Sequence, residues 1–159
     1  MVIFNPLAGG LLSGKYKSVV DKPTEGRFSD GFGFQGEEYR DRYFRSSMFS
    51  ALEILELVVV KHGLTLAEVA LRWCVHHSAL RVTNGEDGVI IGFSNLAQLQ
   101  SDLGDVEKDP LPAEVVATLD RAWSMVQGDA SNYWHGELKY GYDTKNVLFE
   151  EAYSGTSAI

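Results

Sequence analysis

Apolar residues form two short continuous runs. In several longer stretches, apolar residues recur at helical spacing. The first run predicts a buried strand from Val2 to Asn5 that Pro6 cannot continue as an internal ladder. The second run, Val89 to Ile91, is uninterrupted, which is typical of a parallel sheet covered on both faces. The predicted order is strand, long loop, helices, strand, helix, helix and tail.

Two helices are predicted between the strands. Ser46 or Ser47 is expected to cap the first, which runs through Lys61 and is ended by Gly63. The second begins at the capping box Thr65-Leu-Ala-Glu68, in which the threonine and glutamate satisfy each other's backbone donors. The apolar side of this second helix includes Trp73.

Two more helices are predicted after the second strand. Either Ser94 or Asn95 caps the first, which runs to about Leu103. Pro112 stands where a first helical turn accepts proline, and Gly128 closes the last helix. Its periodic apolar positions include Trp123, so we interpret Trp73 and Trp123 as anchors of the core.

The segment 17–45 is polar, rich in glycine and interleaved with aromatic residues, and it predicts a long loop. Loops of this length in compact domains are usually functional or mobile, and the aromatic residues favour function. The pattern fades from Asp129 onward, and we expect residues 136–159 to be a loose tail.

Composition narrows the classes of protein. The 159 residues suffice for one domain, and 45% hydrophobic content is that of a globular core. A formal charge of -8 argues against binding to nucleic acid or to an anionic membrane surface, without excluding a local basic pocket. Cys74 is the single cysteine, so no intrachain disulfide is available. With no apolar run of membrane-spanning length, these features predict a soluble, cytoplasmic chain.

Both strand ends lead into turns suited to anions. Gly9, Gly10 and Gly14 let the first loop approach whatever it wraps. Ser94 stands at a helix start, where backbone N–H groups and the helix dipole attract anions, although the local pattern alone favours an ordinary N-cap over an anion site. The adjacent His76 and His77 point about 100° apart on a helix, which is poor for chelating one metal ion, so we expect no metal site.

Several motifs resemble one family. The segment Asn5-Pro-Leu-Ala-Gly-Gly-Leu-Leu-Ser-Gly-Lys15, the Gly-Arg-Phe at 26–28 and the stretch from Ser94 to Asp102 are similar to aldo-keto reductases of the aflatoxin-aldehyde-reductase branch. Tyr39 and Arg42, and the Asn-Tyr-Trp at 132–134, extend the resemblance. It implies an α/β fold, the C-terminal fragment of a (β/α)8 TIM barrel with its last two strand–helix units, in a partial reductase domain over residues 1–135.

The resemblance also implies a site. Cofactor NADP(H), held weakly or not at all by the isolated chain, is expected to contact residues of three segments: Asn5, Pro6, Leu7, Ala8, Gly9, Gly10, Leu11, Leu12, Gly14, Lys15, Arg27, Ser94, Gln98 and Asp102. Tyr39 and Arg42 match positions near the substrate carboxylate, so the substrate is expected to be a small-molecule aldehyde. Asp102 stands where the family has an asparagine and Phe93 where many relatives have a basic residue, which leaves NADP or NAD preference open.

The resemblance places the family's catalytic Tyr, Lys, Asp and His upstream of Met1, and no motif here supplies them. We therefore expect no catalytic residue in this chain and no activity when it is alone. Three interpretations stay open: the cofactor-binding portion of an NADPH-dependent aldehyde or ketone reductase, a non-catalytic binding chain, or a truncated product without independent activity. Unpaired strand edges suggest pairing with the remaining barrel or self-association.

Overall fold

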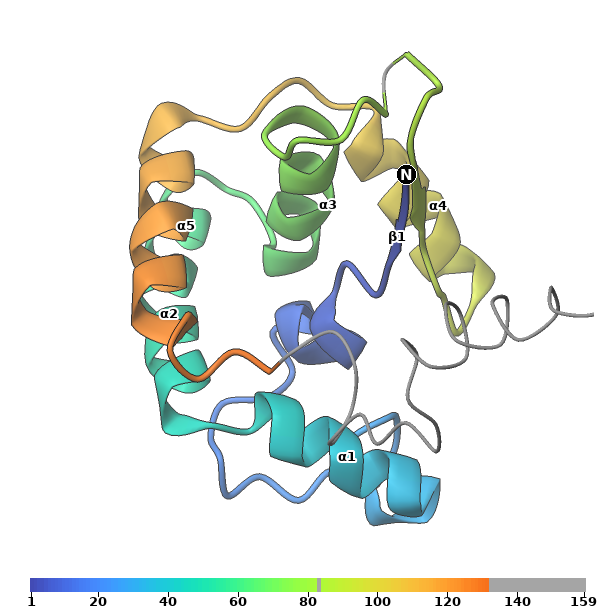
Figure 1. The fold of residues 1–159 in the computed structure, drawn as a ribbon, viewed down its shortest axis with the longest axis vertical. Coiled ribbons are helices and arrows are strands. Elements are labelled where there is room, and N and C mark those ends of the chain that lie inside the picture. Colours follow the sequence, from blue (N-terminus) through green and yellow to red (C-terminus); the bar gives the residue numbers. More distant parts are fainter. Residues whose placement is uncertain (83, 132–159) are drawn as a thin grey trace, which may run out of the picture.

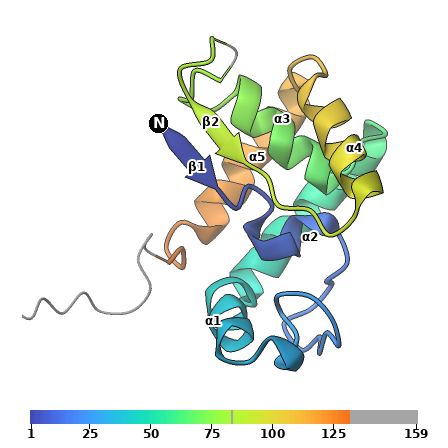
Figure 2. The same ribbon diagram turned by 90° about the vertical axis from the view of Figure 1, so that its right-hand side faces the viewer.

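The computed structural model describes residues 1–82 and 84–131, in which helices pack beside one pair of strands (Figure 1, Figure 2). The predicted tail and the Asn-Tyr-Trp motif lie outside these residues. Among the residues described, no helix is both long and apolar enough to cross a membrane. The elements are, in chain order, β1 (Val2–Phe4), the 3₁₀ segments η1 (Ala8–Ser13) and η2 (Asp30–Phe32), α1 (Phe34–Tyr43), α2 (Ser46–Lys61), α3 (Leu66–His76), β2 (Gly88–Ile90), α4 (Leu96–Val106) and α5 (Ala113–Val126).

The two strands pair in parallel, which confirms the α/β class (Figure 2). Val2 lies opposite Gly88 and Phe4 lies opposite Ile90, so both strands end at the same edge of the sheet. The prediction that the strands are covered on both faces is wrong, because Val2, Phe4 and Ile90 all have exposed side chains. The apolar runs therefore identify the strands correctly, but the described residues cover the faces of the sheet only in part.

Helix α2 spans the predicted residues and ends at Lys61, followed by Gly63 with a φ of 66°. The predicted serine cap is wrong. Arg45 occupies the N-cap position, and the Ser47 hydroxyl instead donates to Asp129 Oδ2 at 2.6 Å. This hydrogen bond ties the start of α2 to the segment after α5, and the two helices pack side by side at the left of Figure 1.

Helix α3 begins as predicted, with Thr65 Oγ1 accepting from the Glu68 backbone N–H at 3.1 Å. Glu68 Oε1 pairs with Arg72 at 2.7 Å and with Lys108 at 3.0 Å, rather than completing the capping box. Burial opposes ionisation of Glu68, but hydrogen bonds from Lys108 and Arg72 hold its pKa below the usual value. Lys108 also contacts Asp105 at 2.8 Å, so the network joins α3 to the end of α4.

Of the two alternatives for the α4 cap, the structure selects Asn95, whose Oδ1 accepts from the Gln98 N–H at 2.9 Å. The helix continues to Val106, three residues beyond the predicted end. Its second half contains two buried acidic residues, Asp102 and Asp105. Pro112 precedes α5 as its N-cap, and α5 ends at Val126, two residues before Gly128.

The predicted loop over residues 17–45 contains a helix, α1. Its sequence, Phe-Gln-Gly-Glu-Glu-Tyr-Arg-Asp-Arg-Tyr, has no clear apolar stripe, so periodicity could not reveal it. Tertiary contacts hold it: Arg40 donates to the Phe28 carbonyl at 2.7 Å, and Tyr39 and Tyr43 meet the ring of Phe28 edge-on. Phe28 itself is fully buried.

The core lies between α2, α3 and α5, with Leu11 and Phe28 completing it. The prediction that Trp73 and Trp123 anchor this core is wrong, because they are 37% and 57% exposed. The periodicity places both tryptophans on apolar helix faces, but these faces extend beyond the part of the core that neighbouring helices cover. Val69 of α3 and Val115 of α5 are buried in this core instead.

Candidate functional site

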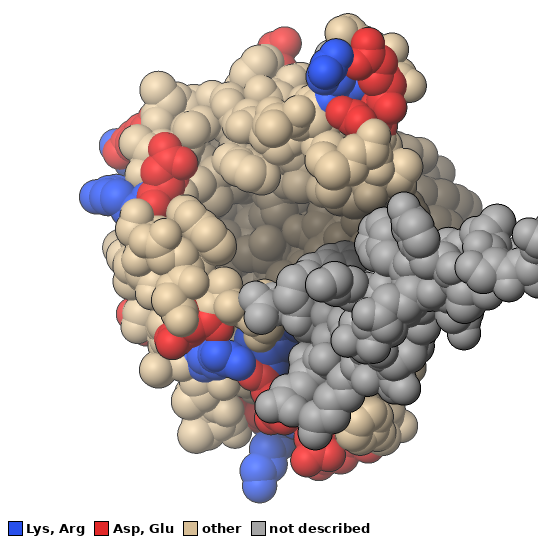
Figure 3. Space-filling view, viewed as in Figure 1, with Lys and Arg blue, Asp and Glu red and all other residues tan. Residues whose placement is uncertain are grey.

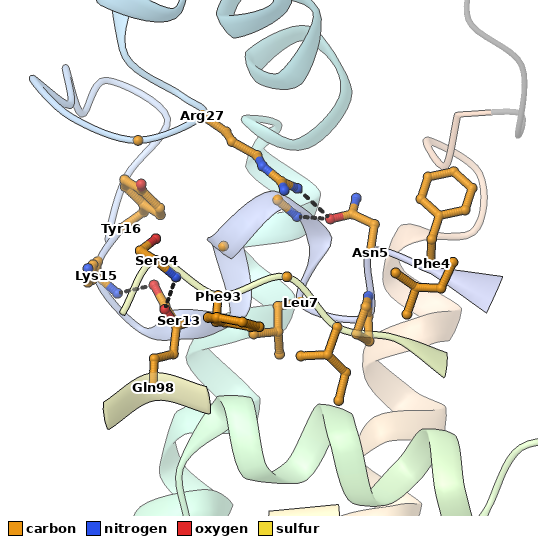
Figure 4. A pocket seen from close by; sticks show the side chains of 17 residues that line it. Phe4, Asn5, Leu7, Ser13, Lys15, Tyr16, Arg27, Phe93, Ser94 and Gln98 are labelled. Atoms are coloured by element: carbon orange, nitrogen blue, oxygen red, sulfur yellow. Dashed lines mark hydrogen bonds between the residues drawn. The ribbon is translucent and has the colours of Figure 1, made fainter. Parts of the chain in front are cut away.

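A pocket of about 380 Å³ opens where the two strands end (Figure 4). We call it the strand-end pocket. The loop after β1 forms one wall, the loop after β2 and the start of α4 form another, and Arg27 reaches in from the segment before η2. Its lining residues are Phe4, Asn5, Pro6, Leu7, Gly9, Gly10, Ser13, Lys15, Tyr16, Gly26, Arg27, Ile90, Ile91, Gly92, Phe93, Ser94 and Gln98.

Asn5 organises the first wall. Its backbone φ is 60°, a left-handed conformation that asparagine tolerates better than most residues. Its Oδ1 accepts from the Gly9 N–H at 2.7 Å and from Arg27 at 3.4 Å, and its Nδ2 donates to the Tyr43 hydroxyl at 3.1 Å. One side chain thus fixes the turn after β1, the guanidinium above it and the end of α1.

Gly9 lets this turn approach α1 closely. A Cβ at Gly9 would lie 2.6 Å from two ring atoms of Tyr39, and the φ of Gly9 is 71°. Any side chain here would therefore have to displace the Tyr39 ring and adopt a strained backbone. The glycine-rich loop is accordingly seated on α1, which the sequence did not reveal.

The lining of the strand-end pocket is cationic. Lys15 and Arg27 contribute positive charges, and no acidic residue is among the described lining residues. The chain as a whole carries a formal charge of -8, so this local excess runs against the overall composition. A cleft lined by one sign of charge concentrates ligands of the opposite sign, and the pocket therefore suits an anion.

The α4 end of the pocket is built from polar groups. Ser94 N–H donates to Gln98 Oε1 at 3.0 Å, and both residues line the cavity (Figure 4). Asp102 follows Gln98 by one helical turn but does not line the pocket. It is 3% exposed, and its Oδ2 has no hydrogen-bond partner among the residues that the structure describes. Burial, and secondarily the neighbouring Asp105, raise the pKa of Asp102.

A second cavity of about 410 Å³ adjoins the first through Arg27. We call it the arginine pocket. Its other lining residues are Phe32, Gln35, Glu38, Tyr39 and Arg42, which come from η2 and α1. The two residues predicted near a substrate carboxylate, Tyr39 and Arg42, thus share one cavity and lie beside the strand-end pocket.

The structure brings most of the predicted cofactor residues together. The predicted residues that line the strand-end pocket are Asn5, Pro6, Leu7, Gly9, Gly10, Lys15, Arg27, Ser94 and Gln98. Ala8, Leu11, Leu12, Gly14 and Asp102 are not lining residues. Leu11 is buried in the core, and the partly buried Ala8 and Leu12 pack against the core from the same segment.

Sequence reasoning missed several lining residues, including Ser13, Tyr16 and Gly26. Ser13 and Gly26 lie inside the motifs at 5–15 and 26–28, and Tyr16 directly follows the first motif, so including every motif position and one following residue finds them. The role of Tyr43 as the partner of Asn5 has no comparable local signal, because 38 residues separate the two in the chain.

Comparison with known proteins identifies the class. The aldo/keto reductase family model matches residues 1–124, and the chain belongs to this family. Its relatives include the aflatoxin B1 aldehyde reductases member 2 of mouse (41% identical over 138 residues) and of human (40% over 138 residues). An aldo-keto reductase of Pseudocercospora fijiensis is 39% identical over 131 residues.

These matches cover 82% of this chain in each case. They cover 36% of the mouse protein, 37% of the human protein and 44% of the fungal protein. The chain therefore spans less than half the length of these relatives, which confirms the sequence-based prediction of a partial aldo-keto reductase of the aflatoxin-aldehyde-reductase type.

Proposed function

We propose that this chain is the C-terminal, cofactor-binding portion of an NADPH-dependent aldehyde or ketone reductase, with residues 1–135 as its partial reductase domain. The observation that carries the proposal is the strand-end pocket, a cationic cavity in an acidic chain. In α/β barrels, phosphate sites form from the loops after strands 7 and 8 and a nearby helix N-terminus. We infer that β1 and β2 are these last two strands of a (β/α)8 barrel.

The residues present fit a phosphate-bearing cofactor. The cavity volume falls within the roughly 300–1,000 Å³ of small-molecule sites. Lys15, Arg27 and the N-terminal end of α4 offer donors to anionic groups, and no donor from the described part of the chain reaches the buried acceptor Asp102 Oδ2. When bound, NADPH would supply the hydride for carbonyl reduction.

We assign the residues to parts of the cofactor as follows. The loop from Leu7 to Lys15 borders the pyrophosphate, and Ser94 and Arg27 hold the 2′-phosphate. Gln98 and Asp102 belong to the adenine end. Because Asp102 is buried beyond the cavity, its contact with adenine requires the carboxylate to turn toward Gln98, one helical turn away.

The arginine pocket supports an aldehyde substrate that carries a carboxylate. Arg42 and Arg27 both line it, and the planar guanidinium fork suits carboxylate oxygens. Similarity to proteins named aflatoxin B1 aldehyde reductase favours the aldehyde class. The hydroxyls of Tyr39 and Tyr43 contact Arg27 and Asn5 rather than a lysine–carboxylate pair, so we assign neither as the general acid.

A second candidate function is association without catalysis. It is favoured by the exposed side chains of Val2, Phe4 and Ile90 on the two-stranded sheet. Unpaired strands and exposed apolar faces recruit partner chains. The partner would be the remainder of a reductase barrel or a second copy of this chain.

Fluorescence titration with NADPH tests the cofactor assignment. It would be run on the 159-residue chain and on the chain joined to the portion of the mouse relative that the match leaves out. We expect Arg27→Ala to weaken binding by about 1.5–3 kcal/mol through loss of a charge-assisted hydrogen bond, and Ser94→Ala by about 0.5–1.5 kcal/mol. Asp102→Asn should tighten binding modestly, because it removes a negative charge and restores a donor.

Arg81→Ala is the matched control, since it removes the same charge from an exposed pair with Glu86. If Arg27→Ala and Ser94→Ala both bind NADPH as tightly as the parent, the assignment is wrong. The same samples, assayed with 2-carboxybenzaldehyde, test for catalysis. Turnover by the isolated chain near the typical enzyme rate of about 10 per second would contradict the expected inactivity.

A further inference from the structure

Tyr39 lies between the two pockets and contacts the parts that define both. It projects from α1, lines the arginine pocket and packs its ring on Gly9 of the strand-end loop. Its ring also meets Phe28 edge-on, with centroids 6.0 Å apart. Since Phe28 is fully buried, the ring of Tyr39 has a fixed support.

Arg27 is exposed and has few restraints of its own. Its NH1 donates to Tyr39 Oη and to Asn5 Oδ1, both at 3.4 Å, and its guanidinium lies over the Tyr39 ring at 5.7 Å. A Cβ built at Gly92 would be 3.5 Å from NH2. One arm of the fork is therefore held by Tyr39 and Asn5, while the other lies beside the loop that follows β2.

We infer that Tyr39 is a positioning residue for Arg27, in addition to being a wall of the arginine pocket. The inference rests on the proposed function, in which Arg27 binds a cofactor phosphate. A long, exposed arginine loses conformational entropy when it is fixed, and a preformed hydrogen bond and ring contact reduce the loss that remains on binding. Tyr39 thus keeps NH2 directed at the strand-end pocket before any ligand arrives.

The same hydroxyl links the two pockets. A tyrosine oxygen that accepts from Arg27 retains its own proton, and it can donate that proton to an acceptor such as a carboxylate in the arginine pocket. A ligand there would orient the hydroxyl and, through it, the guanidinium.

A double-mutant cycle on the full chain tests this role. Tyr39→Phe keeps the ring on Gly9 and beneath the guanidinium but removes the hydroxyl, so the fold is retained. We expect the Kd for NADPH to rise about 2- to 10-fold, the range for one hydrogen bond. In an Arg27→Ala background, Tyr39→Phe should change the Kd by less than about twofold, because coupled residues are not additive.

Tyr16→Phe is the matched control, because it removes another hydroxyl from the lining of the strand-end pocket. Tyr16→Phe should change the Kd for NADPH by the same factor in the parent chain and in the Arg27→Ala variant. Full additivity of Tyr39→Phe with Arg27→Ala would overturn the inference and leave the proposed function intact. Unchanged binding in Arg27→Ala itself would instead contradict the proposed function.

A ligand-free measurement decides the positioning role separately. Rotation of the Arg27 guanidinium about its Nε–Cζ bond can be followed by NMR in the parent and in Tyr39→Phe. We expect faster rotation in the variant, because one of the two acceptors of NH1 is gone. Equal rates would overturn the inference even if the chain binds no NADPH.

Discussion

Two cavities in this molecule differ in the chemical character of the residues that line them. The strand-end pocket is cationic and mixes polar with apolar lining residues, and it is built from turns near the ends of β1 and β2. The other, which we call the helix groove, is an apolar cavity of about 660 Å³ (Figure 3). Figure 3 shows its floor free of charged side chains, which lie toward the rim. It is lined by Ala8, Leu11, Leu12, Arg42, Tyr43, Met48, Ala51, Leu52, Leu55, Trp73, Leu119, Asp120, Ala122, Trp123, Val126, Ala130 and Ser131.

The difference shows that hydrogen bonds between nearby residues can determine the shape of one cavity but not of the other. Hydrogen bonds within the strand-end pocket satisfy Asn5, Gly9 and Ser94, so its shape depends on groups that are present. The helix groove leaves Trp73 and Trp123 partly exposed, and contiguous apolar surface of this kind usually marks an interaction site. We therefore expect the pocket to respond to single backbone changes and the groove to respond to association.

The largest effect should come from Gly9→Ala. Positive φ costs an L-residue about 1–2 kcal/mol. The contact with Tyr39 should add roughly 1–3 kcal/mol of overpacking. We expect the free energy of unfolding in urea to fall by the sum of these terms and NADPH binding to weaken, since the loop and Arg27 share Tyr39 as their support.

Gly10→Ala separates the two costs. Gly10 has a φ of 104°, but a Cβ there would meet no atom of residues 1–82 or 84–131 within 4 Å. We expect this variant to lose only the backbone contribution of about 1–2 kcal/mol. Equal destabilisation in both variants would show that the close contact between Gly9 and Tyr39 has no energetic weight.

A smaller effect is expected for Trp123→Ser in the helix groove. If the groove mediates self-association, losing a tryptophan should weaken it by about 2 kcal/mol, the scale of an interface hot spot. The unfolding free energy of the monomer should stay within about 0.5 kcal/mol, because the side chain is largely exposed. Sedimentation velocity measures the first quantity and urea denaturation the second.

Leu57→Ser provides the comparison for Trp123→Ser. Leu57 is 76% exposed and belongs to α2, but it does not line the helix groove. An equal loss of association in this variant would assign self-association to general surface hydrophobicity. A parent chain that stays monomeric and unfolds sharply would contradict the expectation altogether.

The smallest effect should be a pH dependence where the end of α3 meets the segment before α5. His77 Nε2 accepts from the Leu111 N–H at 2.9 Å and so secures the segment that leads into α5. Burial, followed by the charges of His76 and Arg72, lowers the pKa of His77 from 6.5. The folded state therefore binds fewer protons than the unfolded state, and stability is retained above pH 6.5 and lost as the pH falls through the lowered pKa.

The expected loss is about 0.5–1.5 kcal/mol, the contribution of one hydrogen bond. Urea denaturation between neutral and mildly acidic pH measures it. His77→Gln should flatten this part of the profile, whereas His62→Gln, at an exposed pair with Glu114, should not. Persistence of the whole acid-dependent loss in His77→Gln would assign it to other groups.

How far the sequence predicted the molecule depends on whether a signal was local. Thr65, Asn95 and Gly63 mark helix ends through contacts within a few residues, and the structure confirms each. Helix α1 was missed because its stability depends on Phe28 and the strand-end loop, which no periodic pattern encodes. The tryptophans were misplaced because periodicity identifies an apolar face but not the neighbour that would cover it.

The candidate site follows the same division. The two glycine- and serine-containing turns were recognisable as motifs, and their residues do line one pocket. The arrangement of Tyr39, Tyr43 and Arg27 was not predictable, because it depends on where α1 crosses the turn.

The contacts of Asn5 strongly limit which amino acids can occupy this position. A positive φ favours glycine, asparagine and aspartate. Accepting from Gly9 and Arg27 eliminates glycine, and donating to the Tyr43 hydroxyl requires the amide. Aspartate could keep the contact with Tyr43 only if the tyrosine hydroxyl became the donor. Saturation mutagenesis should therefore find aspartate the best tolerated replacement and side chains without an oxygen acceptor the least tolerated.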